Sequence, residues 1–289
     1  MRCVRPCRAQ KDIVLTTTID GLWALQVLTG IETVAPELGL RPHLPSVEPR
    51  QLALSHPVTS ELRDAGVINQ CDAVDNAVVE WLTVLSRRDI ALFIQMRTPS
   101  DDQAARVLIA RFAQWWVAIE RSADLVRISG VGTACTEAPA SSMLYAEIER
   151  LCGQNTPAPL RPVTLDTDIL RTTPDRQALH DLLVAQRLQP DQLRMLELAA
   201  DPDQSALASI VALQSGVATG RSDRMHIEAS PVTIIDTPAG RLVADDIQSV
   251  GKTWTIIAPG TQGNIDAAIR RMVRRLPADQ DWHSYRKVV

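Results

Sequence analysis

Two short glycine motifs are the first places where this chain could bind a phosphate-bearing ligand. Gly130-Val131-Gly132 has the spacing that opens the G-x-G-x-x-G loop of dinucleotide-binding folds, but Cys135 stands where the third glycine belongs. Gly251-Lys252-Thr253 matches the end of a P-loop, but Asp246 stands where the first glycine is required. Because neither motif is complete, we interpret the first as a flexible loop between a strand and a helix, and the second as a hairpin turn.

Residue types that act as nucleophiles or bind metals are scattered along the chain. The sequence contains no H-E-x-x-H, G-x-S-x-G or C-x-x-C motif. His180 and Asp181 are neighbours on an expected helix, where they point to different faces, so they form no dyad. The sequence therefore predicts no catalytic residue, no cofactor and no metal site. The cysteines are expected to be free thiols, and neither they nor the histidines cluster: Cys3, Cys7, Cys71, Cys135 and Cys152; His43, His56, His180, His226 and His283.

Charge and composition restrict the classes of partner. The 289 residues carry a net charge of -4 and only 3% aromatic residues, which disfavours nucleic acid as a partner. The one sizeable basic cluster, Arg270, Arg271, Arg274 and Arg275, lies opposite the apolar stripe of the last expected helix, as a solvated face does. An RNA- or anion-binding protein that uses this arginine helix is one alternative, and an enzyme with an unrecognised site is another.

Two neighbouring carboxylates, Asp245 and Asp246, alternate across an expected strand and cannot share one site. We interpret one as an exposed acid and the other as the cap of a turn. No apolar run approaches the roughly 20 residues of a membrane span, and the N-terminus lacks the apolar core of a signal peptide. We therefore expect a cytoplasmic protein.

Apolar spacing predicts the elements of the first half of the chain. Helices are expected over 22–28, 57–65 and 74–85, the last capped by Asp72, and a final helix ends at Gly153. β-Branched residues predict a strand over 12–19, and alternation predicts further strands over 90–96, 106–110, 115–121 and 125–129. In the strand over 115–121, Trp115 and Trp116 are expected to point to opposite faces.

The second half repeats this order of elements. One helix is expected to open at Thr173-Pro174 and another at Pro190. Strands follow over 207–213, 226–228, 232–236, 242–247 and 254–258, and then a helix with Ile265, Ile269 and Met272 in one stripe. Residues 226–228 are expected to continue directly into 232–236.

The repeated order predicts an α+β fold with quasi-twofold subdomains, in which a central antiparallel β-sheet is flanked by helical bundles. We place a disordered leader at 1–11, an N-terminal subdomain at 12–155 and a C-terminal subdomain at 156–289. The proline-rich stretch Thr156 to Pro162 separates the two subdomains, which together form one domain.

Several long segments resemble one protein family in the same order along the chain. They are LTTTIDGLWALQVLTGIETVAPELGLRPHLP, WLTVLSRRDIALFI, RFAQWWVAIER, APLRPVTLD and APGTQGNIDAAIRRMVRRLP. The chain resembles the EspG proteins, the secretion-associated chaperones of type VII (ESX) secretion systems, from about Val14 onward. Within the family it looks closest to the member encoded with the second ESX locus.

The resemblance implies a cytosolic chaperone without cofactor or enzymatic activity. Family members bind secreted PE–PPE heterodimers at the tip of the PPE protein, shield an aggregation-prone apolar end and direct the cargo to the ESX machinery. Some chaperones of this kind self-associate when empty, which leaves the oligomeric state open.

A surface that binds an apolar helical tip needs loops that can move aside. Two polar loops, Thr98 to Ala105 and Gly216 to Arg224, fit this requirement. The resemblance implies that the helix around Gln192 to Ala200 also contributes to the contact. We expect the client to dock on the sheet between these three segments. The predicted contact residues are Thr98, Pro99, Ser100, Asp101, Asp102, Gln192, Met195, Leu196, Gly216 and Gly220.

Overall fold

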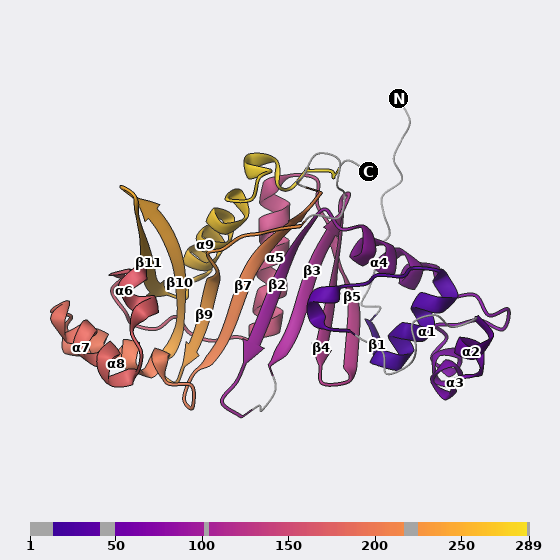
Figure 1. Cartoon of the computed structure of the whole chain (residues 1–289), viewed down its shortest axis with the longest axis horizontal. Coiled ribbons are helices and arrows are strands. Elements are labelled where there is room, and N and C mark those ends of the chain that lie inside the picture. The colour runs from indigo at the N-terminus through magenta and orange to yellow at the C-terminus, as the bar shows by residue number, and fades with distance from the viewer. Residues whose placement is uncertain (1–13, 41–49, 101–103, 217–224, 288–289) are drawn as a thin grey trace. The chain divides into compact units, whose positions relative to one another are not determined.

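The computed structural model of the chain describes residues 14–40, 50–100, 104–216 and 225–287 (Figure 1). The expected leader at 1–11 lies outside these residues, as do Asp101, Asp102 and Gly220. The chain forms two compact units. The first contains its described residues up to Asp89 together with Val107–Ala134, and the second contains Ile90–Arg106 and its described residues from Cys135 on.

In the first unit, one strand is followed by a run of helices and then by a run of strands. The helices are α1 (Ile19–Thr29), η1 (Pro36–Leu38), α2 (Arg50–Ser55), α3 (Pro57–Asp64) and α4 (Asn76–Arg87). The strands are β1 (Val14–Thr18), β3 (Ala105–Phe112), β4 (Trp115–Ser122) and β5 (Leu125–Thr133), in the spatial order β1-β5-β4-β3. Antiparallel pairing joins β1 to β5 and β5 to β4.

Helix α4 begins three residues later than the predicted cap implies. The Asp75 carboxylate accepts a hydrogen bond from the backbone N–H of Ala77 at 2.8 Å, so Asp75 is the N-cap. Asp72 instead has a left-handed backbone with φ 59° and forms an ion pair with Arg63. The prediction of Asp72 as the cap was wrong, because two acidic residues of equal capping propensity stand three positions apart.

The second unit pairs one early strand with strands from late in the chain. Its strands are β2 (Ile90–Arg97), β6 (Val163–Asp166), β7 (Ala206–Ser215), β8 (Met225–Ile227), β9 (Val232–Thr237), β10 (Gly240–Ser249) and β11 (Lys252–Pro259). The spatial order is β2-β7-β9-β10-β11-β6, all antiparallel, and β8 pairs with the far end of β7. Both β8 and β9 pair with β7, which confirms that they continue one another along the sheet.

Helices cover the sheet of this unit from both sides. They are α5 (Glu137–Cys152), α6 (Thr167–Thr172), α7 (Arg176–Ala185), α8 (Pro190–Ala200), α9 (Gln262–Arg274) and the short η2 (Asp279–Asp281). Figure 1 shows α5 and α9 behind β2, β7 and β9. Helix α7 starts at Arg176, because Asp175 and not Thr173 caps it by accepting from the N–H of Ala178 at 2.9 Å. The antiparallel pairing with flanking helices confirms the predicted α+β class.

Buried tryptophans mark where the helices of the first unit pack. Trp81 on α4 is 4% exposed, and a Cβ added at Gly130 on β5 would lie 3.3 Å from its indole nitrogen. Trp116 is 1% exposed and its neighbour Trp115 is 37% exposed, which confirms that the two indoles point to opposite faces of β4. Gly130 therefore lies within a strand against α4, and not in the flexible loop that we expected.

We predict that Trp81→Ala lowers the free energy of unfolding by about 3–5 kcal/mol, because it opens a large cavity between α4 and the strands below it. Chemical denaturation followed by far-UV circular dichroism measures this change. The matched control is Trp115→Ala, which removes a partly exposed indole and should change stability much less. Equal effects of the two substitutions would contradict this account of the core.

Candidate partner-binding surface

One face of the second unit's sheet is only partly covered. In β7, Ala208, Ile210 and Ala212 are buried on the side of α9, and the amide oxygen of Gln214 accepts from the backbone N–H of Ala278 at 2.9 Å. On the opposite side of the sheet, Ala91, Leu213 and Ile235 are buried, whereas a second set of residues of β2, β7 and β9 stays half-buried or exposed. We call this set the open sheet face: Phe93, Gln95, Arg97, Leu207, Ser209, Val211 and Thr233.

Cross-strand pairing places these side chains in contiguous rows. Phe93 lies opposite Val211, and Arg97 lies opposite Leu207. Ser209 lies between Gln95 and Thr233, its partners on the two neighbouring strands. Directly opposite residues of antiparallel strands share a face, so the rows form one surface with apolar and neutral polar side chains and one cation.

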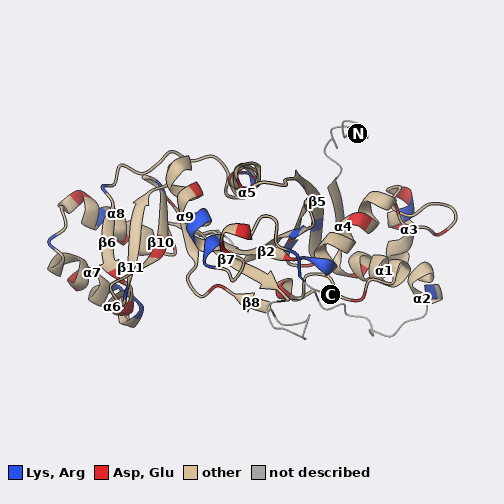
Figure 2. Ribbon diagram, turned by 90° about the horizontal axis from the view of Figure 1, so that it is seen from above, with Lys and Arg blue, Asp and Glu red and all other residues tan. Residues whose placement is uncertain are grey.

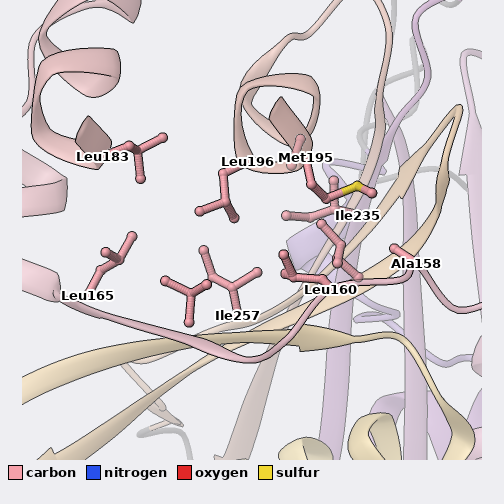
Figure 3. Packing of buried hydrophobic residues seen from close by; sticks show 11 residues of the cluster. Ala158, Leu160, Leu165, Leu183, Met195, Leu196, Ile235 and Ile257 are labelled. Atoms are coloured by element: carbon pink, nitrogen blue, oxygen red, sulfur yellow. The ribbon is translucent and has the colours of Figure 1, made fainter. Parts of the chain in front are cut away.

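Helices α7 and α8 bound this surface by covering the rest of the same face. Leu183, Met195, Leu196 and Ala199 pack on Ile235, Leu242 and Ile257 of the strands below (Figure 3). Leu207, at the margin of the open sheet face, is partly buried against the same cluster. The uncovered surface therefore ends where this core begins.

The predicted contact residues on α8 occupy two different environments. Met195 is 7% exposed and Leu196 is 4% exposed, and the Thr237 hydroxyl lies 3.8 Å from the Met195 sulfur. Gln192 is half-buried, accepts from the backbone N–H of Gln189 at 3.0 Å and donates to the carbonyl of Arg161 at 3.3 Å. Met195 and Leu196 thus hold α8 on the sheet, and Gln192 secures the start of the helix.

The predicted loop residues lie at the ends of β2 and β7. Thr98, Pro99 and Ser100 follow β2 directly, and the Thr98 and Ser100 hydroxyls are 3.2 Å apart. Gly216 follows β7 with φ 74°, and a Cβ there would approach the Lys287 Cβ to 2.6 Å. The Tyr285 hydroxyl donates to the carbonyl oxygen of Ser215 at 2.9 Å, so the C-terminal segment packs on the end of β7.

The arginines of α9 bind carboxylates of the chain itself. Arg271 pairs with Asp245 at 2.9 Å, Arg274 with Glu137 at 2.7 Å, Arg275 with Glu228 at 3.0 Å, and Arg270 with Asp266. Figure 2 shows the basic positions of α9 among acidic positions of the neighbouring elements. This pairing does not support the alternative of an RNA- or anion-binding arginine helix, because the charges are already neutralised.

The two adjacent aspartates of β10 are both buried, which corrects the expectation of one exposed acid and one turn cap. Asp245 is 3% exposed and binds Arg271. Asp246 is 8% exposed, binds Arg171 at 3.0 Å and accepts from the Thr255 hydroxyl at 2.7 Å. The side chains of Asp245 and Asp246 point to opposite faces of β10, as expected for adjacent residues of a strand.

A groove lies between α5 and α9 in this unit. It has a volume of about 430 Å³, and its lining residues are Glu137, Ala138, Ser141, Ser142, Tyr145, Gln262, Gly263, Asp266 and Arg270. The hydrogen bond from Arg274 holds the pKa of Glu137 below its ordinary value. Its charged groups are engaged in ion pairs and no histidine or cysteine lines it, so the groove lacks an activated nucleophile.

Metal-binding residue types do not cluster in the described ranges. No group of three or more His, Cys, Asp or Glu residues there could hold a metal ion. Burial raises the pKa of Cys152 to about 11, which leaves its thiol protonated and unreactive. Val250 and Gly251 form the tight connection between β10 and β11, which confirms the hairpin turn predicted for Gly251-Lys252-Thr253. Within the described residues, no helix is long and apolar enough to cross a bilayer.

Comparison with known proteins identifies the family. The model of the EspG family matches residues 18–271. The chain belongs to the EspG family. It is 46% identical over 277 residues to the ESX-2 secretion-associated protein EspG2 of Mycobacterium tuberculosis, a match that covers 96% of this chain and all of that protein. It is 23% identical to the ESX-5 protein EspG5 of M. tuberculosis, over 95% of this chain and 97% of the relative.

A solved EspG structure shares the fold. The M. tuberculosis type VII secretion system chaperone EspG5, solved in complex with a PE25–PPE41 dimer, superposes with a TM-score of 0.72 at 21% identity. The match covers 95% of this chain and 100% of that EspG5 chain. The expected EspG fold is therefore confirmed. The greater identity to EspG2 than to EspG5 confirms the expected resemblance to the second ESX locus.

We predict that Met195→Ala lowers the free energy of unfolding by about 2–5 kcal/mol, because Met195 fills the core between α8 and the strands. Chemical denaturation measures this loss. Gln192→Ala is the control on the same helix and should cost clearly less, since it removes polar contacts near the surface. A Met195→Ala protein as stable as the wild type would contradict the packing of α8.

We also predict that the Glu137–Arg274 pair makes stability depend on acidic pH. The folded-state pKa of Glu137 is lowered, so its contribution is present above the unfolded-state pKa of roughly 4.3 and is lost as pH falls through the folded-state value. Glu137→Gln should be less stable than the wild type at neutral pH, and the difference should shrink on acidification. A difference in melting temperature that is constant with pH would refute this role.

Proposed function

We propose that the chain is a cytoplasmic chaperone that binds a PE–PPE heterodimer at the tip of the PPE protein. In this proposal it prevents aggregation of its client and directs it to a type VII (ESX) secretion system. The observation that carries the proposal is family membership over nearly the whole chain, together with the solved complex of the related EspG5 with a PE25–PPE41 dimer.

The client docks on the open sheet face. Phe93, Leu207 and Val211 offer half-buried apolar area without a covering helix, which is the kind of surface that partners occupy. Thr98, Pro99 and Ser100 border this surface at the end of β2, and Gly216 at the end of β7. Helix α8 bounds it on the third side, with Met195 and Leu196 as its support and Gln192 at its start.

The chain acts by binding, without catalysis, a cofactor or a metal ion. Support for this comes from the ion pairs that engage the charged groups of the α5–α9 groove and from the protonated state of Cys152. A chaperone needs a surface complementary to its client and a way to release that client, and neither requires a nucleophile. The absence of an activated nucleophile in the groove therefore fits the proposed role.

We predict that co-expression with PE–PPE pairs encoded near ESX loci yields a complex that elutes as one species in size-exclusion chromatography. The client without the chaperone should aggregate, because its apolar tip is then exposed to water. Light scattering during a temperature ramp measures this protection. Failure of every PE–PPE pair tested to bind or to be protected would overturn the proposed function.

Charged substitutions test the docking face. Phe93→Asp and Val211→Asp should each weaken capture of the client by roughly tenfold or more, because an unpaired carboxylate would be buried in the interface. Thr164→Asp is the matched control, since Thr164 is an exposed strand residue that points to the other side of the sheet. Circular dichroism verifies folding. Full-strength binding by folded Phe93→Asp and Val211→Asp would place the client on another surface.

A further inference from the structure

The open sheet face carries a single charged side chain, that of Arg97. Arg97 is the last residue of β2, is exposed and lies opposite Leu207 of β7. Within the described part of the chain, Arg97 takes part in no ion pair or side-chain hydrogen bond. The arginines of α9 differ in this respect, because each binds a carboxylate.

The surroundings of Arg97 favour an anion. Its neighbours on the open sheet face are neutral, namely Gln95, Ser209 and Thr233 with the apolar Phe93, Leu207 and Val211. Carboxylates farther along the same side are already engaged, since Asp246 binds Arg171 and Thr255, and Glu197 binds His180. No described carboxylate on this face neutralises the guanidinium or repels an incoming acid.

Docking of a partner changes the solvation of this guanidinium. A partner that covers Phe93 and Leu207 also removes water from the side of Arg97. A guanidinium has five N–H donors and no acceptor, so it needs oxygen acceptors in place of the lost water. A carboxylate fits best, because it receives two parallel hydrogen bonds and neutralises the charge. A partner without such a group would leave an unpaired charge in the interface.

We propose that Arg97 is a specificity-determining residue of the open sheet face, and that it selects clients whose docking segment presents a carboxylate beside its apolar contact residues. This inference rests on the proposed function and adds the chemistry by which one client is preferred over another. The apolar rows provide the contact area, and Arg97 rejects apolar tips that lack an acid.

The test uses the full chain and a PE–PPE heterodimer that it captures. Titration calorimetry over a series of NaCl concentrations compares the wild type with Arg97→Ala, Arg97→Lys and Arg97→Glu. We expect Arg97→Ala to weaken binding roughly tenfold and Arg97→Glu to weaken it further. The salt dependence of the Kd should become flatter in Arg97→Ala, because one screened attraction is lost. Arg97→Lys should restore only part of the affinity, since lysine cannot form the bidentate pair.

Arg87→Glu is the matched control, because Arg87 is an exposed arginine at the end of α4 in the other compact unit. It changes the net charge as Arg97→Glu does and should leave affinity near that of the wild type. Arg97→Ala is then combined with alanine substitutions at each acidic residue of the client's docking segment. One such residue should show coupling to Arg97, so that the loss of binding free energy in the double mutant is smaller than the sum of the losses in the two single mutants.

The outcomes separate this inference from the proposed function. If the wild type captures the client but Arg97→Glu binds it equally well at low salt, the role of Arg97 is overturned and the chaperone function stands. Equal losses in Arg97→Glu and Arg87→Glu, or no coupling to any client acid, also overturn it, because net charge alone would then explain the effect. If the wild type captures no PE–PPE heterodimer, the proposed function itself fails.

Discussion

Helix α9 determines which face of the second unit's sheet is closed. Its apolar stripe of Ile265, Ile269 and Met272 is buried on the strands. Arg271, Arg274 and the C-cap residue Arg275 reach carboxylates on other elements. The pairing with Asp245 matters most, because a carboxylate that is 3% exposed is stable in its charged form only with a partner. Contacts of both kinds tie α9 to one side of the sheet, and α5 packs beside it.

Closure of one face by α9 leaves the other face for α7, α8 and, in our proposal, a partner. These two helices cover only the outer strands of the unit, where Leu183 and Leu196 reach Ile257 and Leu242. The strands β2 and β7 keep their second face half-exposed. The structure thus divides one sheet between a face covered by α9 and a face that helices cover only in part.

Much of the fold follows from local patterns, and the errors have local causes. The period of Val78, Trp81 and Leu85 predicts α4 well, and Pro190 marks the start of α8 correctly. Strand β6 was missed, because four residues between a proline and a helix carry too little alternation. The capping residues Asp75 and Asp175 each compete with a nearby residue of similar propensity. The burial of Asp246 depends on Arg171, which lies far away in the sequence, and no local pattern contains that information.

The proposed docking surface was less predictable than the fold. The run from Ile90 to Ile94 is apolar at every position, so the sequence alone does not reveal that Phe93 is half-exposed and Ile94 is buried. That difference depends on which face α9 covers. Met195 and Leu196 show the converse, because we expected them to contact the client, whereas both side chains are buried beneath α8. Arg97 carries no signal in sequence, since its lack of an ion pair is a property of the folded chain.

The pairing of β2 with β7 has a consequence for the synthesis of the protein. The chain passes from the first unit into the second at Ile90, returns at Val107 and leaves again at Cys135, so neither unit is one continuous stretch. On the ribosome, β2 emerges long before β7, the strand to which it pairs from Ile90↔Gln214 to Arg97↔Leu207. The apolar residues of β2 therefore remain unpaired with β7 until that strand has been synthesised. Contacts between residues so far apart in sequence also form slowly. A nascent chain of this chaperone passes through an interval in which it needs the kind of protection from aggregation that it provides to others.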